Sequence, residues 1–160
     1  MGKWAKAYFE KLKKDEGESF DRKQANALER QHVLAKAPIM WDEMVDLMFE
    51  EVDDLQSMRP GHITRKDERQ GSPSKVRIST QHRHLELTFK PDVPQIKYHI
   101  WEPRSSPLTG NTEILSGEFE PQVQDQEVLL FSKTGYREPR GLFTVPDAVD
   151  ELLRRFGPTS

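Results

Sequence analysis

The clearest pattern in the chain is a change of hydrophobic period about halfway along it. Up to about residue 60, apolar residues recur every three or four positions, as on one face of a helix. From about residue 75 they alternate with polar residues, as in strands with one buried face. The pattern therefore predicts a helical first part, 1–60, followed by an antiparallel sheet, 62–145.

Three helices are expected in the first part. Trp4, Tyr8 and Leu12 recur at intervals of four residues on a lysine-rich segment, which predicts a short amphipathic helix that ends near Gly17. A second helix, with a weaker apolar face, ends at the residue before Pro38. The third helix begins at Pro38, because proline is well tolerated in a first helical turn. Its apolar positions form the most regular helical face in the chain: Trp41, Met44, Val45, Met48, Val52 and Leu55.

The strand pattern is regular enough to predict how the strands pair. A slip of one residue would turn all the apolar side chains of a strand to the wrong face. With short turns at 80–83 and 91–94, one row across the sheet contains Ile78, Leu85, Ile100 and Leu115. The neighbouring rows are Val76, Leu87 and Tyr98, and Phe89, Ile96 and Phe119. After a turn at 122–126, a fifth strand, 127–133, is expected to add Leu129 and Phe131 to the same face.

The last predicted element is a helix at 146–156. Thr144 and Asp147 resemble the start of a capping box, and Val149, Leu152 and Phe156 follow at helical spacing. The polar segment 62–74 fits either an edge hairpin or a loop. The chain is therefore expected to form one α+β domain, 1–160, with N-terminal helices, an antiparallel β-meander of about five to six strands, and a C-terminal helix. Helices and sheet would form two layers.

Composition narrows the class of protein. The 160 residues include no cysteine, which excludes disulfides, thiolate metal sites and a cysteine nucleophile. No apolar run approaches the roughly 18 residues of a membrane span, and the first residues lack the apolar stretch of a signal peptide. We therefore expect a cytoplasmic protein without membrane contact.

Candidate chemistry gathers on the polar face of the predicted sheet. The register places Arg77, Glu86 and His99 in one row, with Ser116 beside His99. A histidine held by a carboxylate can act as a general base, and His84, Glu86 and His99 together could hold a divalent metal. The simpler interpretation is a cross-strand ion pair between Arg77 and Glu86 on a solvated face. We favour the ion pair and expect neither a metal nor a cofactor.

Three further features of the sequence indicate what kind of partner the protein could bind: an acidic segment, a basic segment and an apolar patch. Residues 42–54 hold seven carboxylates, which is typical of the solvated side of an amphipathic helix and would also suit a basic partner. The basic segment 59–83 lacks interleaved aromatic residues that stack on bases, so nucleic acid is not expected. The predicted register leaves an apolar patch on the outer face of the later strands: Trp101, Ile114, Val128 and Leu130. Such a patch would be covered by a helix of this chain, by a second subunit or by another protein.

No motif identifies an activity, since the chain has neither a nucleotide-binding glycine loop nor a Gly-x-Ser-x-Gly elbow. We therefore expect a small non-enzymatic binding or protein-interaction module, whose partner is a second copy in a homodimer or another protein. Two alternatives stay open. One is a small-molecule pocket between the helices and a curved sheet. The other is a metal-assisted or acid–base enzyme centred on His99, Glu86 and His84.

Overall fold

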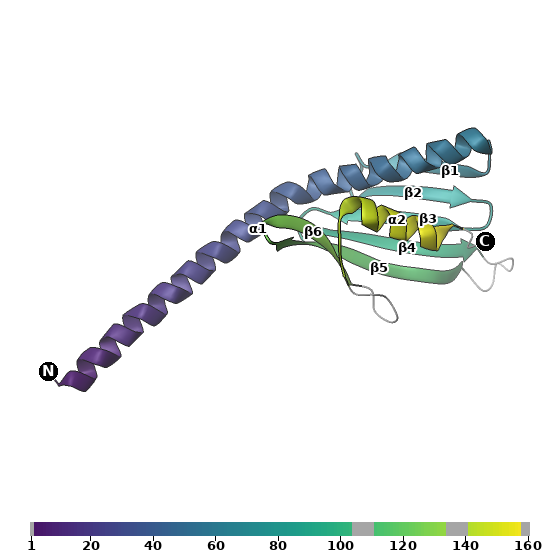
Figure 1. Cartoon of the computed structure of the whole chain (residues 1–160). Helices are drawn as coiled ribbons and strands as arrows, with labels where there is room; N and C mark the ends of the chain where they lie inside the picture. The colour runs from purple at the N-terminus through teal and green to yellow at the C-terminus, as the bar shows by residue number, and fades with distance from the viewer. Residues whose placement is uncertain (1, 104–110, 134–140, 158–160) are drawn as a thin grey trace.

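The computed structural model describes residues 2–103, 111–133 and 141–157, which form an α+β structure of two layers. Helix α1 comes first, seven strands follow, and helix α2 comes last (Figure 1). The elements are α1 (Lys3–Met58), β1 (Ile63–Glu68), β2 (Ser74–Thr80), β3 (His84–Lys90), β4 (Gln95–Pro103), β5 (Asn111–Gln124), β6 (Glu127–Ser132), β7 (Leu142–Phe143) and α2 (Val145–Phe156). The strands form one antiparallel sheet in chain order, and residues of both helices share one hydrophobic core with one face of that sheet. The predicted layout is therefore confirmed, with seven strands rather than five or six.

The prediction of several N-terminal helices is wrong, because α1 is one helix of 56 residues. Pro38 lies in its interior, where proline lacks a donor and crowds the preceding turn at a cost of about 3 kcal/mol. One side of the turn around it is buried, with Ala37, Met40 and Trp41 at 1–3% exposure, and this burial offsets the cost. Gly17 costs only about 1 kcal/mol relative to alanine, which is too little to end a helix. Figure 1 shows that α1 is bent, as helices with an interior proline commonly are.

Only the second half of α1 is covered by the sheet. The buried residues of the helix all lie in this half: Ala37, Met40, Trp41, Met44, Val45, Met48, Phe49 and Val52. Residues 3–32, which we call the arm, are exposed except for the half-buried Ala5. The arm extends away from the sheet, and the N-terminus lies at its far end (Figure 1).

The predicted register of β2 to β5 is confirmed. Ile78 pairs with Leu85, Leu85 with Ile100 and Ile100 with Leu115. The two neighbouring rows are also present: Val76, Leu87 and Tyr98, and Phe89, Ile96 and Phe119. The segment that sequence left open forms an edge hairpin, since β1 pairs antiparallel with β2. These rows present one apolar face to the helices.

Strand β6 faces the opposite way from the prediction. Val128 and Leu130 are buried in the core beneath the helices, at 8% and 0% exposure, whereas Leu129 and Phe131 are half-buried on the other face. The reason is the length of the turn before β6. It consists of two residues, Asp125 and Gln126, rather than five, with φ angles of 50° and 67° as in tight hairpins. An odd change in turn length reverses every side chain of the following strand.

Helix α2 begins as predicted. Thr144 is its N-cap, and the Thr144 hydroxyl accepts a hydrogen bond from the backbone N–H of Asp147 at 3.3 Å. Such a bond satisfies one of the free N–H groups of the first turn. The helix then buries Ala148, Val149 and Leu152 in the shared core.

Truncation of a side chain between the layers should lower stability strongly. Leu87 is 0% exposed, so Leu87→Ala should reduce the free energy of unfolding by about 2–5 kcal/mol in urea titrations followed by circular dichroism. The matched control is Leu28→Ala in the arm, where Leu28 is 66% exposed and a change within about 0.5 kcal/mol is expected. Equal effects of the two substitutions would contradict this assignment of the core.

Candidate functional site

Trp101 is the centre of a side-chain cluster on the open face of the sheet, the face opposite the helices. Its ring stacks against His84 at a centroid distance of 5.2 Å and against His99 at 4.8 Å. The guanidinium of Arg77 lies 5.2 Å from the ring centroid, within cation–π range. These neighbours leave Trp101 only 9% exposed. The two histidine rings thus shield the large indole ring of Trp101 from solvent.

The expected Arg77–Glu86 ion pair is present. Nη2 of Arg77 lies 2.7 Å from Oε2 of Glu86, and both residues pair across β2 and β3. Glu86 lies opposite His99 on β4, as predicted, but its carboxylate is engaged by the arginine. Both side chains are partly exposed, so the pair contributes at most about 1 kcal/mol.

The three residues considered for a metal or for acid–base chemistry are neighbours with separate partners. Nδ1 of His84 lies 2.8 Å from the hydroxyl oxygen of Ser79, and Nε2 of His99 lies 3.6 Å from a carboxylate oxygen of Glu113. Among the residues that the structure describes, no three histidine, aspartate or glutamate side chains are grouped as metal ligands would be. The geometry favours a solvated sheet face over a metal centre.

The apolar patch expected at Trp101, Ile114, Val128 and Leu130 does not form. Val128 and Leu130 lie on the helix side of the sheet, whereas Trp101 lies on the open face. Ile114 is 40% exposed and is the extra residue of a β-bulge in β5, opposite the step from Ile100 to Trp101. These four residues therefore offer no common surface to a partner.

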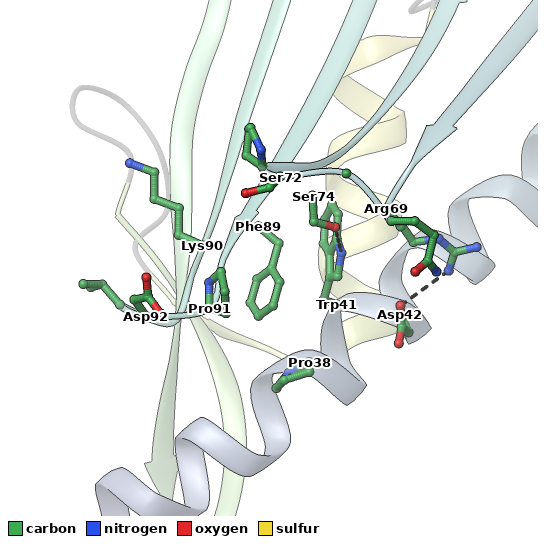
Figure 2. A pocket seen from close by; sticks show the side chains of 14 residues that line it. Pro38, Trp41, Asp42, Arg69, Ser72, Ser74, Phe89, Lys90, Pro91 and Asp92 are labelled. Carbon is green, nitrogen blue, oxygen red and sulfur yellow. Dashed lines mark hydrogen bonds and ion pairs between the residues drawn. The ribbon is translucent and has the colours of Figure 1, made fainter.

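A cavity of about 770 Å³ opens where α1 first meets the sheet (Figure 2). Trp41 and Phe89 line its apolar side, with ring centroids 5.6 Å apart. The indole N–H of Trp41 donates to the hydroxyl oxygen of Ser74 at 3.0 Å, which satisfies the polar group of a ring only 3% exposed. The remaining lining comes from Pro38 and Asp42 of α1, from Lys90 at the end of β3, and from the β1–β2 and β3–β4 turns. The sequence left open a pocket between the helices and the sheet but did not indicate these residues, because the lining is brought together from three distant segments.

Arg69 forms a charged wall of the cavity and is engaged by three carboxylates. Its Nη1 lies 2.9 Å from Asp46 and 3.6 Å from Asp42, and its Nη2 lies 2.8 Å from Asp67. Hydrogen bonding to Arg69 holds the pKa of the Asp67 carboxyl below its usual value. Because these bonds occupy the guanidinium, Arg69 is better suited to holding the β1–β2 turn against α1 than to binding an anion.

The arm presents large apolar side chains to solvent. At the arm tip, which we define as residues 3–14, Trp4, Tyr8, Phe9 and Leu12 are 41–76% exposed. Trp4 and Tyr8 stack at a centroid distance of 5.4 Å. The sequence indicated this stripe of residues but could not show that it would stay uncovered. Neither helix in the described part of the chain is long and apolar enough to cross a bilayer.

The apolar face of the arm tip continues the face of α1 that forms the core. Each of its four large side chains precedes a buried residue by 36 positions, which is about ten turns of an α-helix. The four pairs are Trp4 and Met40, Tyr8 and Met44, Phe9 and Val45, and Leu12 and Met48. The tip therefore carries the same pattern of large apolar side chains as the buried part of α1, but no sheet covers it.

His84 should make the stability of the protein depend on pH. Desolvation, with a further effect from the charge of Arg77, lowers the pKa of His84 from its ordinary 6.5. The unfolded chain therefore binds a proton more readily, so the contribution of His84 is complete above pH 6.5 and is lost as the pH falls through the folded pKa. Between about pH 7.5 and about pH 5, His84→Gln should lose less free energy of unfolding than the wild type.

The control for this prediction is His82→Gln, which changes an exposed histidine in the adjoining turn. Urea titrations at both pH values should give this variant the same acid loss as the wild type. An unchanged acid loss in His84→Gln would contradict the assignment.

The comparisons with known proteins identify no relative. No protein-family model matches the chain, and no curated protein or solved structure is significantly similar to it.

Proposed function

We propose that this protein is a non-enzymatic binding module that recognises its partner through the N-terminal arm. The observation that carries the proposal is the exposed apolar face of the arm tip. Trp4, Tyr8, Phe9 and Leu12 lie together on one side of a helix, at 41–76% exposure. A contiguous apolar patch of this kind usually marks an interaction site. The sheet and the second half of α1 act as the rigid base that holds the arm.

The energetics of the arm support this proposal. Helices in proteins gain most of their stability when an apolar face packs against other elements. The apolar face of the arm has almost no such packing, because its residues are exposed. Local contacts such as Lys13 over the Phe9 ring, at 4.7 Å, add only tenths of a kcal/mol. Gly17, with no atom near its Cβ position, weakens the helix further. A partner that covers the arm would stabilise it.

The other surfaces support binding rather than catalysis. The carboxylate of Glu86 and the guanidinium of Arg69 are held in ion pairs, and the rings of His84 and His99 pack on Trp101. A general base needs free access to the proton that it removes. Groups held in this way are suited to maintaining the sheet surface.

The proposal is tested by photo-crosslinking from the arm of the full-length protein in the cells that express it. A photoreactive phenylalanine analogue in place of Tyr8, on the apolar face, should give a discrete adduct. The matched control carries the same analogue in place of Ala7, which lies on the polar side of the helix, and should give at most a trace. Equal labelling, or no adduct from either position, would overturn the proposal.

A small-molecule site is a second candidate, favoured by the cavity at Trp41 and Phe89. Its volume of about 770 Å³ lies within the range of about 300–1,000 Å³ typical of ligand pockets. Native mass spectrometry of freshly purified protein should then show a retained compound. Val93→Asp, at a lining residue 66% exposed, should abolish the added mass, while Ile114→Asp on β5 should not. A wild-type spectrum without added mass would exclude this candidate.

A further inference from the structure

We infer that the arm tip binds the C-terminal end of α1 in a second copy of this chain, so that two copies form an antiparallel dimer. The inference rests on the proposed function, because it names the partner of the same arm. Each copy would supply one tip and one groove, and the two contacts would be equivalent.

The groove lies between the end of α1 and the last turn of α2, with a volume of about 310 Å³. Its lining is mainly apolar, from Val52, Leu55, Met58, Ile63, Leu153 and Phe156. The accessible apolar surface comes from Met58, which is 74% exposed, and from the half-buried Leu55 and Leu153, whereas Val52, Ile63 and Phe156 are buried beneath them at 3–5% exposure. Two exposed carboxylates, Glu51 and Asp54, stand beside it, and no lysine or arginine is among the described lining residues.

The arm tip is complementary to this groove in both polarity and charge. Its apolar face carries large side chains of the size that fill such grooves, led by Trp4. Residues 3–14 include five lysines and a single acid, Glu10. By contrast, residues 37–58 contain seven carboxylates and no lysine or arginine. Asp42 and Asp46 pair with Arg69 and Asp53 pairs with Arg65, while Glu51 and Asp54 beside the groove are exposed. The two ends of α1 thus carry opposite charges beside apolar surfaces, as at a self-complementary interface.

The tip cannot occupy the groove of its own chain. Trp4 and Leu55 are 51 residues apart on one helix, which separates them by about 77 Å at 1.5 Å per residue. Figure 1 shows the N-terminus and the end of α1 at opposite ends of the molecule. In an antiparallel pair, a two-fold axis near the middle of α1 brings both tips level with both grooves. In such a dimer each tip occupies the groove of the other copy, so that no tip or groove stays unoccupied.

An anionic membrane is the main rival occupant, because basic amphipathic helices also bind lipid surfaces. The apolar face of the tip, however, lies on the side of α1 that packs on the sheet, ten turns before Met40 and Met44. A flat bilayer laid along that side would meet the sheet. Binding of the tip to a membrane would also leave the apolar groove and its carboxylates uncovered.

The inference is tested by charge reversal in the full-length protein, with light scattering and sedimentation equilibrium as readouts. The wild type should have twice the mass of the 18.6 kDa chain. The tip variant Lys3→Glu, Lys6→Glu and the groove variant Glu51→Lys, Asp54→Lys should each weaken the dimer about tenfold or more. A chain with all four substitutions should recover dimerisation, because the opposite charges face each other again.

A matched control changes two exposed lysines on the open face of the sheet, Lys66→Glu and Lys97→Glu, and should dimerise as the wild type does. Circular dichroism of every variant checks that the fold is intact. A monomeric wild type, a dimer unaffected by either pair of changes, or a failure of the fourfold variant to recover would overturn the inference.

Cysteine crosslinking supplies a second, positional test, since these 160 residues contain no cysteine. A variant with Ala5→Cys and Met58→Cys should form intermolecular disulfides under mild oxidation. The pair Ala5→Cys and Ile114→Cys should not, because Ile114 lies on the bulge of β5 rather than at the groove. Equal crosslinking of the two pairs would count against the antiparallel arrangement.

The outcomes separate this inference from the proposed function. If Tyr8 crosslinks to a different protein, the arm is a binding element but its partner is not a second copy. If the wild type is monomeric and vesicles containing anionic lipid sediment it but not the tip variant, the occupant is a membrane surface. The first result overturns the dimer alone, whereas a membrane occupant or the absence of any protein adduct overturns both the dimer and the recognition of a protein partner.

Discussion

The structure depends on the burial of one side of α1 against the apolar face of the sheet. Met44, Val45 and Met48 are fully buried there, in one core with strand residues such as Ile78 and Leu85 that are equally inaccessible. This contact offsets the unfavourable proline inside the helix and gives the meander its second layer. Because α1 is continuous, the same contact sets the direction of the arm and positions the cavity at one end of the sheet and the groove at the other.

The two exposed parts of the molecule use aromatic residues differently. On the open face of the sheet, Trp101 is covered by His84, His99 and Arg77, so a large apolar ring is removed from water by polar neighbours. On the arm tip, Trp4 stacks on its neighbour Tyr8 but stays 76% exposed. The large ring on the open face is therefore covered by residues of the same chain, whereas the large rings of the arm tip stay exposed to solvent.

Much of the sheet could be predicted because its determinants are local. Side chains alternate strictly between faces and the turns between β2, β3 and β4 are short, so one register alone kept Val76, Leu85 and Ile96 on a common face. That register also placed Arg77 opposite Glu86 and hence predicted their ion pair. The start of α2 was equally local, since Thr144 caps its own first turn.

By itself, the sequence determined the order of β2 to β6, the register of β2 to β5, the capped last helix and which side of each helix is apolar. Only the tertiary structure decided that α1 continues through Pro38, because the compensating burial comes from strands far along the chain. It also decided the face of β6, since one residue more or less in a turn reverses a strand. Hydrophobic period shows which face of the arm is apolar, but not whether anything covers it; that depends on how far the sheet reaches along α1.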